Sequence, residues 1–214
     1  MSKYLTAYFN TKNILSVMIA CTLLLTLSAC GSTSGVANTD PSAEAPASTA
    51  EQTQQSSAKV LVVVFSATGT TKGVAERIAA MESADLYEIV PAVPYSEDDL
   101  NWRDSSSRAT KEQSDRFVRP CIASEALELA GYEKIYLGYP IWWGEEPRIM
   151  DTFVESYDFS GITMIPFCTS SSSDIGGSRQ SLAELAGSGN WMEGGRFPGS
   201  TSDSDLQSWL ENLR

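Results

Sequence analysis

Residues 60–71 read VLVVVFSATGTT, and this stretch indicates the fold class of the chain. Its first six residues are apolar and mostly β-branched, as expected of a strand that is buried on both faces of a parallel sheet. A short polar turn follows, after which apolar residues recur at helical spacing: Val74, Ala75, Ile78 and Ala79. A buried strand that leads through a tight turn into a helix is typical of parallel α/β proteins.

Similar segments follow along the rest of the chain. We expect further strands at residues 85–90, 135–138 and 162–167, and a weaker fifth strand at 191–197. Helices are expected from Pro147, which suits a first helical position, around residues 182–185, and over residues 206–213. Strands that alternate with helices predict a parallel sheet with right-handed crossovers, and five strands in about 157 residues match the smaller doubly wound fold.

One segment does not fit a simple crossover. Residues 96–119 are mostly polar, and the segment is too long for a plain connection between two elements. We expect it to pack along the edge of the sheet or to cover a site.

Residues 1–29 have the pattern of an export signal. Lys3 and Lys12 make the first residues weakly basic, and an apolar run from Ile14 to Ala29 follows. This run is short for a membrane-spanning helix but suits the core of a signal peptide. The run ends in Leu-Ser-Ala-Cys at residues 27–30, which resembles the lipobox of bacterial lipoproteins. This resemblance implies that Cys30 is lipidated and anchors the exported domain on the outer face of the cytoplasmic membrane or in the cell envelope. The alternative is an ordinary signal peptide or a short membrane anchor.

Residues 30–57 form the expected linker, and residues 58–214 form the expected folded domain. After Gly31 the sequence is rich in Ser, Thr, Ala, Pro, Gln and Glu, and Val36 is its one large apolar residue. Such a segment cannot bury enough apolar surface to offset its ordering entropy, so we expect a flexible tether.

The net charge of the chain limits the classes of partner that it can bind. The formal charge of the whole sequence is −12, and loss of residues 1–29 removes two lysines and no acid, which leaves −14. An acidic protein of this kind is a poor ligand for nucleic acid. A basic redox partner protein is compatible with it, although acidity also serves solubility alone.

The residue types exclude several chemistries. The sequence contains no histidine, which excludes histidine metal sites and Ser-His-Asp or Cys-His catalysis, and we expect no metal site. Cys121 and Cys168 are the cysteines that remain beyond the lipobox, too few for a disulfide scaffold. The sequence leaves open whether they pair.

Three unusual loops follow strands whose carboxyl ends should meet, which is where open α/β sheets bind ligands. The loop at residues 66–71 (SATGTT) presents hydroxyls and backbone N–H groups at a helix N-terminus, which suits a phosphate. The loop at residues 139–144 (YPIWWG) has two adjacent tryptophans, of which at least one should face a cleft and could stack on a flat ligand. The loop at residues 168–177 (CTSSSSDIGG) lets a ligand approach the backbone closely. A ligand-free helix cap, core tryptophans and a mobile surface loop are the structural alternatives.

These loops resemble those of the flavodoxin family. The resemblance rests on the ordered motifs VVFSATGTT at 63–71, DLNW at 99–102, GYPIWW at 138–143 and FVESYDFSG at 153–161. It extends over nearly all of residues 59–214 and is similar to a short bacterial flavodoxin-like family. It implies a three-layer α/β/α fold with a doubly wound five-stranded parallel sheet of order 2-1-3-4-5. It also implies flavin mononucleotide (FMN) over the carboxyl ends of strands 1, 3 and 4.

The resemblance further implies which residues contact FMN. The phosphate would be held by Ser66, Thr68, Gly69, Thr70 and Thr71. The isoalloxazine would be flanked by Pro140, Ile141, Trp142, Trp143 and Gly144, and its pyrimidine side would be reached by Thr169, Ser170 and Ser171. Two departures stand out, because Thr70 replaces the asparagine of many relatives and the third loop has four serines and Asp174 where more glycine is expected.

The implied function is electron transfer by FMN, with the protein tuning the flavin. Glu145, Glu146 and Asp174 fall in the loops expected around the ring, where their charge would disfavour an anionic reduced flavin, unless they serve only solubility. Gly144 could turn its peptide toward the flavin N5. Two other functions stay open, an FMN-dependent oxidoreductase of the NAD(P)H:quinone type, for which no nicotinamide motif is recognisable, and a binding module without flavin.

Overall fold

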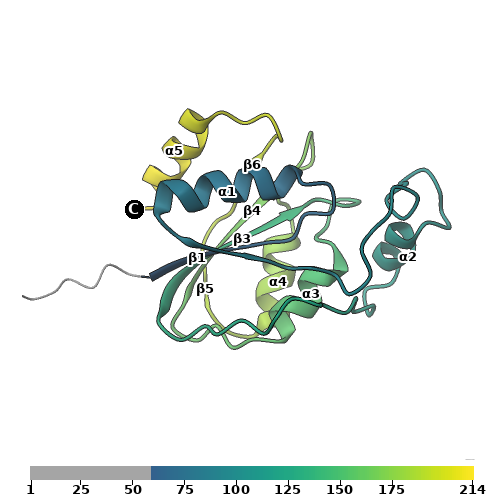
Figure 1. Cartoon of the computed structure of the whole chain (residues 1–214), viewed down its shortest axis with the longest axis horizontal. Coiled ribbons are helices and arrows are strands. Elements are labelled where there is room, and N and C mark those ends of the chain that lie inside the picture. The colour runs from purple at the N-terminus through teal and green to yellow at the C-terminus, as the bar shows by residue number, and fades with distance from the viewer. Residues whose placement is uncertain (1–58) are drawn as a thin grey trace, which may run out of the picture. The chain divides into compact units, whose positions relative to one another are not determined.

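The computed structural model of the chain describes residues 59–214 (Figure 1). The expected signal peptide, the linker and the lipidation site Cys30 lie outside these residues. Within them, no helix is both long and apolar enough to cross a membrane.

The strands of this part form one parallel sheet. They are β1 (Lys59–Val64), β2 (Asp85–Glu88), β3 (Tyr132–Pro140), β4 (Thr163–Thr169), β5 (Asn190–Trp191) and β6 (Gly195–Phe197). The strand order is β2-β1-β3-β4-β5, and β6 also pairs with β4. The predicted order of the doubly wound sheet is confirmed.

The fifth strand is interrupted, whereas the sequence predicted a single weak strand over residues 191–197. Pro166, in the middle of β4, explains the interruption. Met192 donates its backbone N–H to the carbonyl oxygen of Met164 at 2.9 Å, so the backbone groups of Met164 and, two residues on, Pro166 face the same side. Proline has no N–H to donate, and pairing resumes where Phe167 and its successors meet β6.

Four helices cover the two faces of the sheet (Figure 1). Helices α1 (Thr70–Glu82) and α5 (Asp203–Asn212) pack on one face, and α3 (Arg148–Glu155) and α4 (Ser178–Ala186) pack on the other. Helix α3 begins one residue later than predicted, with Pro147 at its N-cap in an extended conformation. The predicted three-layer α/β/α arrangement is confirmed.

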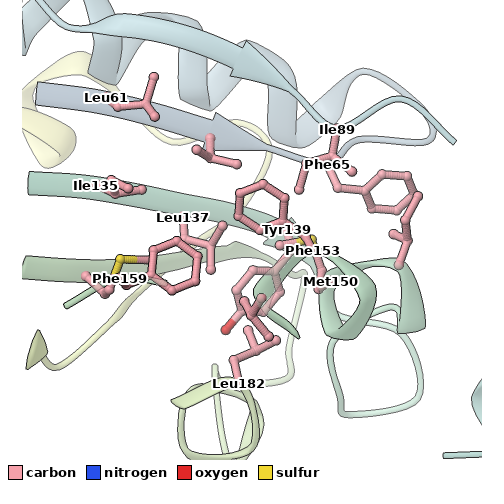
Figure 2. Packing of buried hydrophobic residues seen from close by; sticks show 14 of the residues in the cluster. Leu61, Phe65, Ile89, Ile135, Leu137, Tyr139, Met150, Phe153, Phe159 and Leu182 are labelled. Carbon is pink, nitrogen blue, oxygen red and sulfur yellow. The ribbon is translucent and has the colours of Figure 1, made fainter. Parts of the chain in front are cut away.

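Alternate residues of β1 point into two cores. Leu61 and Val63 are buried on the side of α3 and α4, and Val62 and Val64 are buried on the side of α1 and α5. Figure 2 shows part of the first core, where side chains of β1, β3, α3 and α4 meet. Burial of both faces explains why the strand is apolar throughout.

The two cysteines of the domain do not pair. Cys168 is buried in β4, Cys121 is exposed, and both are free.

Helix α2 (Arg108–Ser114) lies apart from the three layers, beyond the ends of the strands (Figure 1). It belongs to the long polar segment 96–119. Ser107 caps its N-terminus by accepting a hydrogen bond from the backbone N–H of Thr110. The segment is therefore ordered by local bonds and contributes to the end of the sheet where a ligand would bind.

Candidate functional site

A pocket of about 760 Å³ lies at the carboxyl ends of β1, β3 and β4. Of the thirteen residues predicted to hold a ligand, eleven line it. The other two, Gly69 and Gly144, lie in the same loops and have φ values of 84° and 87°. These left-handed conformations favour glycine, so both residues shape the loops and do not form the wall.

The loop after β1 offers hydrogen-bond donors without charge. Gly69 is the N-cap of α1 and has no side chain to cap it, so N–H groups of the first turn are left for a ligand. The hydroxyl of Ser66 is buried and has no hydrogen-bond partner among the described residues. Leaving such a group unpaired costs about 1–3 kcal/mol, which a ligand oxygen would recover. The nearby Lys72 is bound to Glu88 at 2.7 Å and does not line the pocket.

Hydroxyls also connect the first loop to the third. Thr71 and Thr169 are both buried, and their Oγ1 atoms lie 2.7 Å apart. The Oγ1 atoms of Thr68 and Thr70 are 3.3 Å apart at the exposed side of the same loop. Ser170 donates its backbone N–H to the carbonyl oxygen of Phe197 at 3.0 Å, which fixes the start of the third loop.

Residues 142–145 form a two-residue hairpin turn at the end of β3. The backbone N–H of Trp142 donates to the carbonyl oxygen of Glu145 at 2.9 Å, and the reverse bond measures 3.0 Å. The central residues, Trp143 and Gly144, have φ values of 49° and 87°, as in a type I′ turn. Tryptophan seldom adopts the left-handed conformation, and such strain concentrates at functional sites.

The two tryptophans have different surroundings, although both line the pocket. Trp142 is half-buried, and its ring packs edge-on against Phe65 and Tyr95, with centroids at 5.8 and 5.3 Å. Trp143 is 49% exposed. The strained turn therefore holds the Trp143 ring at the open side of the pocket, and Trp142 forms a fixed wall.

Segment 96–119 forms a further wall that includes Leu100 and Trp102. The segment is fastened to the tryptophan hairpin by Gln113, whose Nε2 donates to the carbonyl oxygens of Trp142 and Glu146 at 3.1 Å each. The sequence left open whether this segment packs at an edge or covers a site. The structure places it at the site.

Seven residues that line the pocket were not predicted: Ala67, Leu100, Trp102, Ala109, Ser172, Ser173 and Gly199. The sequence could have indicated Trp102 as a pocket residue, because it is a large aromatic residue in an otherwise polar segment. Nothing in the sequence indicated Gly199. A Cβ on Gly199 would lie 2.6 Å from Cγ2 of Thr70, so glycine lets the chain before α5 approach the first loop.

No charged side chain of the described residues lines the pocket. The loops that carry Glu145, Glu146 and Asp174 do border the pocket, as predicted, but none of these three side chains lines it. Glu145 is paired with Arg148, and Glu146 is buried and accepts a hydrogen bond from Ser181 at 2.6 Å. The hairpin turns these carboxylates away from the pocket.

Glu146 belongs to a buried charged cluster behind the hairpin, and the exposed Glu145 pairs with Arg148 of this cluster. Burial raises the pKa of Glu146, and it raises the pKa of Asp151 to about 7, with the charge of Glu146 adding to the effect. Arg148 and Arg119 oppose the shift of Asp151, at 3.6 and 3.5 Å from its carboxylate. The cluster therefore makes the stability of the domain depend on pH.

The pocket combines an uncharged cradle of N–H and hydroxyl donors with aromatic walls. A terminal phosphate suits the cradle, and a flat ring system suits the walls. FMN has both a terminal phosphate and a flat ring system. The unpaired hydroxyl of Ser66 can donate a hydrogen bond to the phosphate. Fold and site together define a mononucleotide-binding protein of the doubly wound α/β class.

Comparison with known proteins specifies this class further. The sequence profile of the flavodoxin family matches residues 59–213. A candidate flavoprotein of Bacteroides uniformis is 42% identical, with a TM-score of 0.69 over 72% of this chain and 98% of its own. A candidate flavoprotein of Bacteroides eggerthii is 40% identical, with a TM-score of 0.68 over 73% of this chain and 98% of its own.

A flavoprotein of Lactobacillus acidophilus, solved in complex with FMN, shares the fold at 22% identity, with a TM-score of 0.55 over 72% of this chain and 99% of its own. No curated protein matches the chain. The chain belongs to the flavodoxin family.

Proposed function

We propose that the chain is an FMN-binding electron-transfer protein that is tethered to the membrane surface. The observation that carries this proposal is one pocket in which a neutral phosphate cradle adjoins two tryptophan side chains. FMN supplies the redox chemistry when bound, so the pocket needs no acid, base or nucleophile of its own.

The first loop is assigned to the phosphate. Ser66, Thr68 and Thr70 offer hydroxyls, and the first turn of α1 offers backbone N–H groups. Each hydrogen bond to a charged group contributes about 1.5–3 kcal/mol, so several of them can replace a cation. The positive end of the α1 dipole favours the same ligand.

The hairpin and the third loop are assigned to the ring system. Trp142 and Trp143 would contact the isoalloxazine, and Thr169 and Ser170 would reach polar atoms of its pyrimidine side. Since no carboxylate lines the pocket, acidic groups act on a reduced flavin only from behind the hairpin and from the rest of the domain.

The pocket suits electron exchange with another protein. Trp143 and Trp102 are 49% and 64% exposed at its margin, so a partner could dock there without entering the domain. The lipid expected on Cys30 and the linker of residues 31–57 would keep the domain near membrane-bound redox proteins. Its negative charge favours a basic partner.

An anaerobic redox titration of protein purified from its native compartment tests the carrier function. We expect the spectrum of bound FMN, reversible reduction without loss of the flavin, and no sustained oxidation of NAD(P)H by a quinone. Sustained turnover would support the oxidoreductase, and absence of flavin would support the flavin-free binding module.

Lipid labelling tests the tether independently. Wild-type protein should incorporate labelled fatty acid, and Cys30→Ala should lose the label and either be released from the membrane or accumulate as the uncleaved precursor. Labelling that persists in the variant would contradict anchoring at Cys30.

A further inference from the structure

Trp142 begins a chain of contacts that leads away from the pocket. Its ring lines the pocket and meets the ring of Tyr95 edge-on, with the centroids 5.3 Å apart. Phe65 packs against both rings at 5.8 and 5.9 Å. Trp142 and Tyr95 are oxidisable side chains in van der Waals contact, so an electron has a short route from Tyr95 to the pocket.

Tyr95 has a proton acceptor at its hydroxyl group. The hydroxyl donates to Oε2 of Glu112 at 2.6 Å, a distance typical of a charge-assisted hydrogen bond. Glu112 belongs to α2 and is buried. Burial and this bond raise the pKa of Tyr95 well above its usual range, so the phenol keeps its proton in the resting protein. An oxidised tyrosine is a strong acid, and its proton would have an acceptor in contact.

Arg108 holds this acceptor in place. Its Nε donates to Oε1 of Glu112 at 2.7 Å, its guanidinium lies 4.0 Å from the ring centre of Tyr95, and its Nη1 donates to the carbonyl oxygen of Val93. Arg108 and Glu112 also line a separate depression of about 640 Å³. A proton on Glu112 can therefore exchange with solvent without crossing the flavin pocket.

We propose that Trp142, Tyr95 and Glu112 form a relay that moves an oxidising equivalent out of the flavin pocket and holds it on Tyr95. The relay rests on the proposed function, because its oxidant is bound FMN in the photoexcited state. Trp142 would give one electron to the photoexcited flavin, Tyr95 would give one electron to the oxidised Trp142, and the phenolic proton of Tyr95 would move to Oε2 of Glu112. The electron would be accepted by the flavin, Tyr95 would be left as a neutral radical and Glu112 protonated, and the reverse transfers would restore the resting protein.

The chain offers a matched control for this chemistry. The hydroxyl of Tyr132 donates to Oδ2 of Asp85 at 2.6 Å, the same kind of bond at the same length. Tyr132 and Asp85 lie at the first residues of β3 and β2, at the opposite end of the sheet from the pocket. Tyr132 should therefore take no part in the relay.

Laser-flash absorption and electron paramagnetic resonance of the FMN-loaded protein test the relay. The wild type should give a tyrosyl radical after the flash, with slower return in D2O than in H2O. Tyr95→Phe should lose this signal and shorten the lifetime of the charge-separated state, whereas Tyr132→Phe should keep both. Glu112→Gln should lower the radical yield and abolish the D2O effect, because the ring stays and the acceptor is lost.

A tyrosyl signal that survives in Tyr95→Phe, or a lifetime equal to that of the wild type, would overturn the relay. The visible spectrum of each sample shows its FMN content before the flash. A wild-type protein without FMN would overturn the proposed function together with the relay, whereas a loaded protein that does not depend on Tyr95 would overturn the relay alone. If Tyr95→Phe does not load, the comparison of Glu112→Gln with the wild type decides the question.

Discussion

The hydroxyl of Ser66 is buried and has no hydrogen-bond partner among the described residues. We therefore expect it to favour FMN binding and to lower the stability of the flavin-free protein. Ser66→Ala should weaken FMN binding by about 1.5–3 kcal/mol, because a hydrogen bond to the charged phosphate is lost. The flavin-free protein should be as stable as the wild type or more stable, because an unpaired buried polar group is removed. Fluorescence titration and urea unfolding measure the two effects. Riboflavin lacks the phosphate, so an equal loss of riboflavin affinity would contradict the assignment of Ser66.

Trp143 occupies a left-handed conformation at φ 49° and is half exposed, which suggests that its position serves a ligand. Trp143→Gly should stabilise the flavin-free protein by about 1 kcal/mol through relief of this strain. It should also weaken FMN binding by about 0.5–1.5 kcal/mol through loss of stacking, and it should raise the fluorescence of the bound flavin.

Trp142→Ala is the contrasting variant for Trp143→Gly. Trp142 packs on Phe65 and Tyr95, so its loss should lower the free energy of unfolding by on the order of 2 kcal/mol. If neither variant changes the affinity or the fluorescence of FMN, the ring system binds elsewhere.

Asp151 should make the flavin-free domain less stable as the pH rises. The pKa of Asp151 is raised from its ordinary value of 3.8 to about 7 in the folded protein, so the folded state binds the proton more tightly than the unfolded chain does. The stability gained from this proton is complete below about pH 4 and is lost as the pH rises to about 7, a change on the order of a few kcal/mol. Asp151→Asn should flatten the fall in unfolding free energy between about pH 5 and pH 8, a window in which a chain without histidine has few other titrating groups.

Glu155 provides the control for Asp151. Hydrogen bonds from Arg119 lower the pKa of Glu155, so its contribution to stability is lost only in acid, below its ordinary value of 4.5. Glu155→Gln should therefore change the slope between about pH 5 and pH 8 much less than Asp151→Asn does, because the charge of Glu155 is the smallest of the causes that shift the pKa of Asp151. A slope that is the same in Asp151→Asn and in the wild type would contradict the raised pKa of Asp151.

Among the elements, segment 96–119 makes the most specific prediction, because it carries two exposed aromatic residues with different positions. Trp102 lines the pocket, and Phe117 is 80% exposed and does not line it. Trp102→Ala should weaken FMN binding by about 1 kcal/mol, on the scale of an aromatic contact, and Phe117→Ala should leave it unchanged. Isothermal titration of both variants checks this, and equal effects would mean that the segment acts only as a scaffold.

Elements were predictable where their pattern depends on neighbours along the chain. The apolar run at residues 60–65 predicted a doubly buried strand because each of its faces meets helices. The break between β5 and β6 was not predictable, because it depends on Pro166 of another strand and on a register that no local pattern records. The same limit applies to Gly199, whose role depends on a contact with a loop far away in sequence.

The candidate site was predictable through its loops more than through its charges. The loop residues follow strands whose carboxyl ends must meet in a parallel sheet, so eleven of them could be placed at one pocket. Glu145 and Glu146 lie in the same hairpin, yet their direction is set by the turn and by Arg148 and Ser181. Proximity in sequence therefore placed the loop correctly but not the side chains.

On the scale of the whole molecule, the net charge of the chain contrasts with the uncharged wall of its pocket. The sequence carries −12, and the described pocket wall carries no charged side chain. A phosphate therefore meets long-range repulsion from the domain, which salt screens, but no carboxylate at the pocket wall. This arrangement leaves recognition of FMN to neutral hydrogen bonds and aromatic contact.

The central claim is that this pocket recognises FMN through its phosphate as well as its ring. The most direct test is fluorescence titration of the flavin-free protein with FMN and, separately, with riboflavin. We predict that FMN binds with strong quenching and that riboflavin binds much more weakly, because it cannot use Ser66, Thr68 and the N-terminus of α1. Equal affinity for the two flavins, or binding of neither, would contradict the claim.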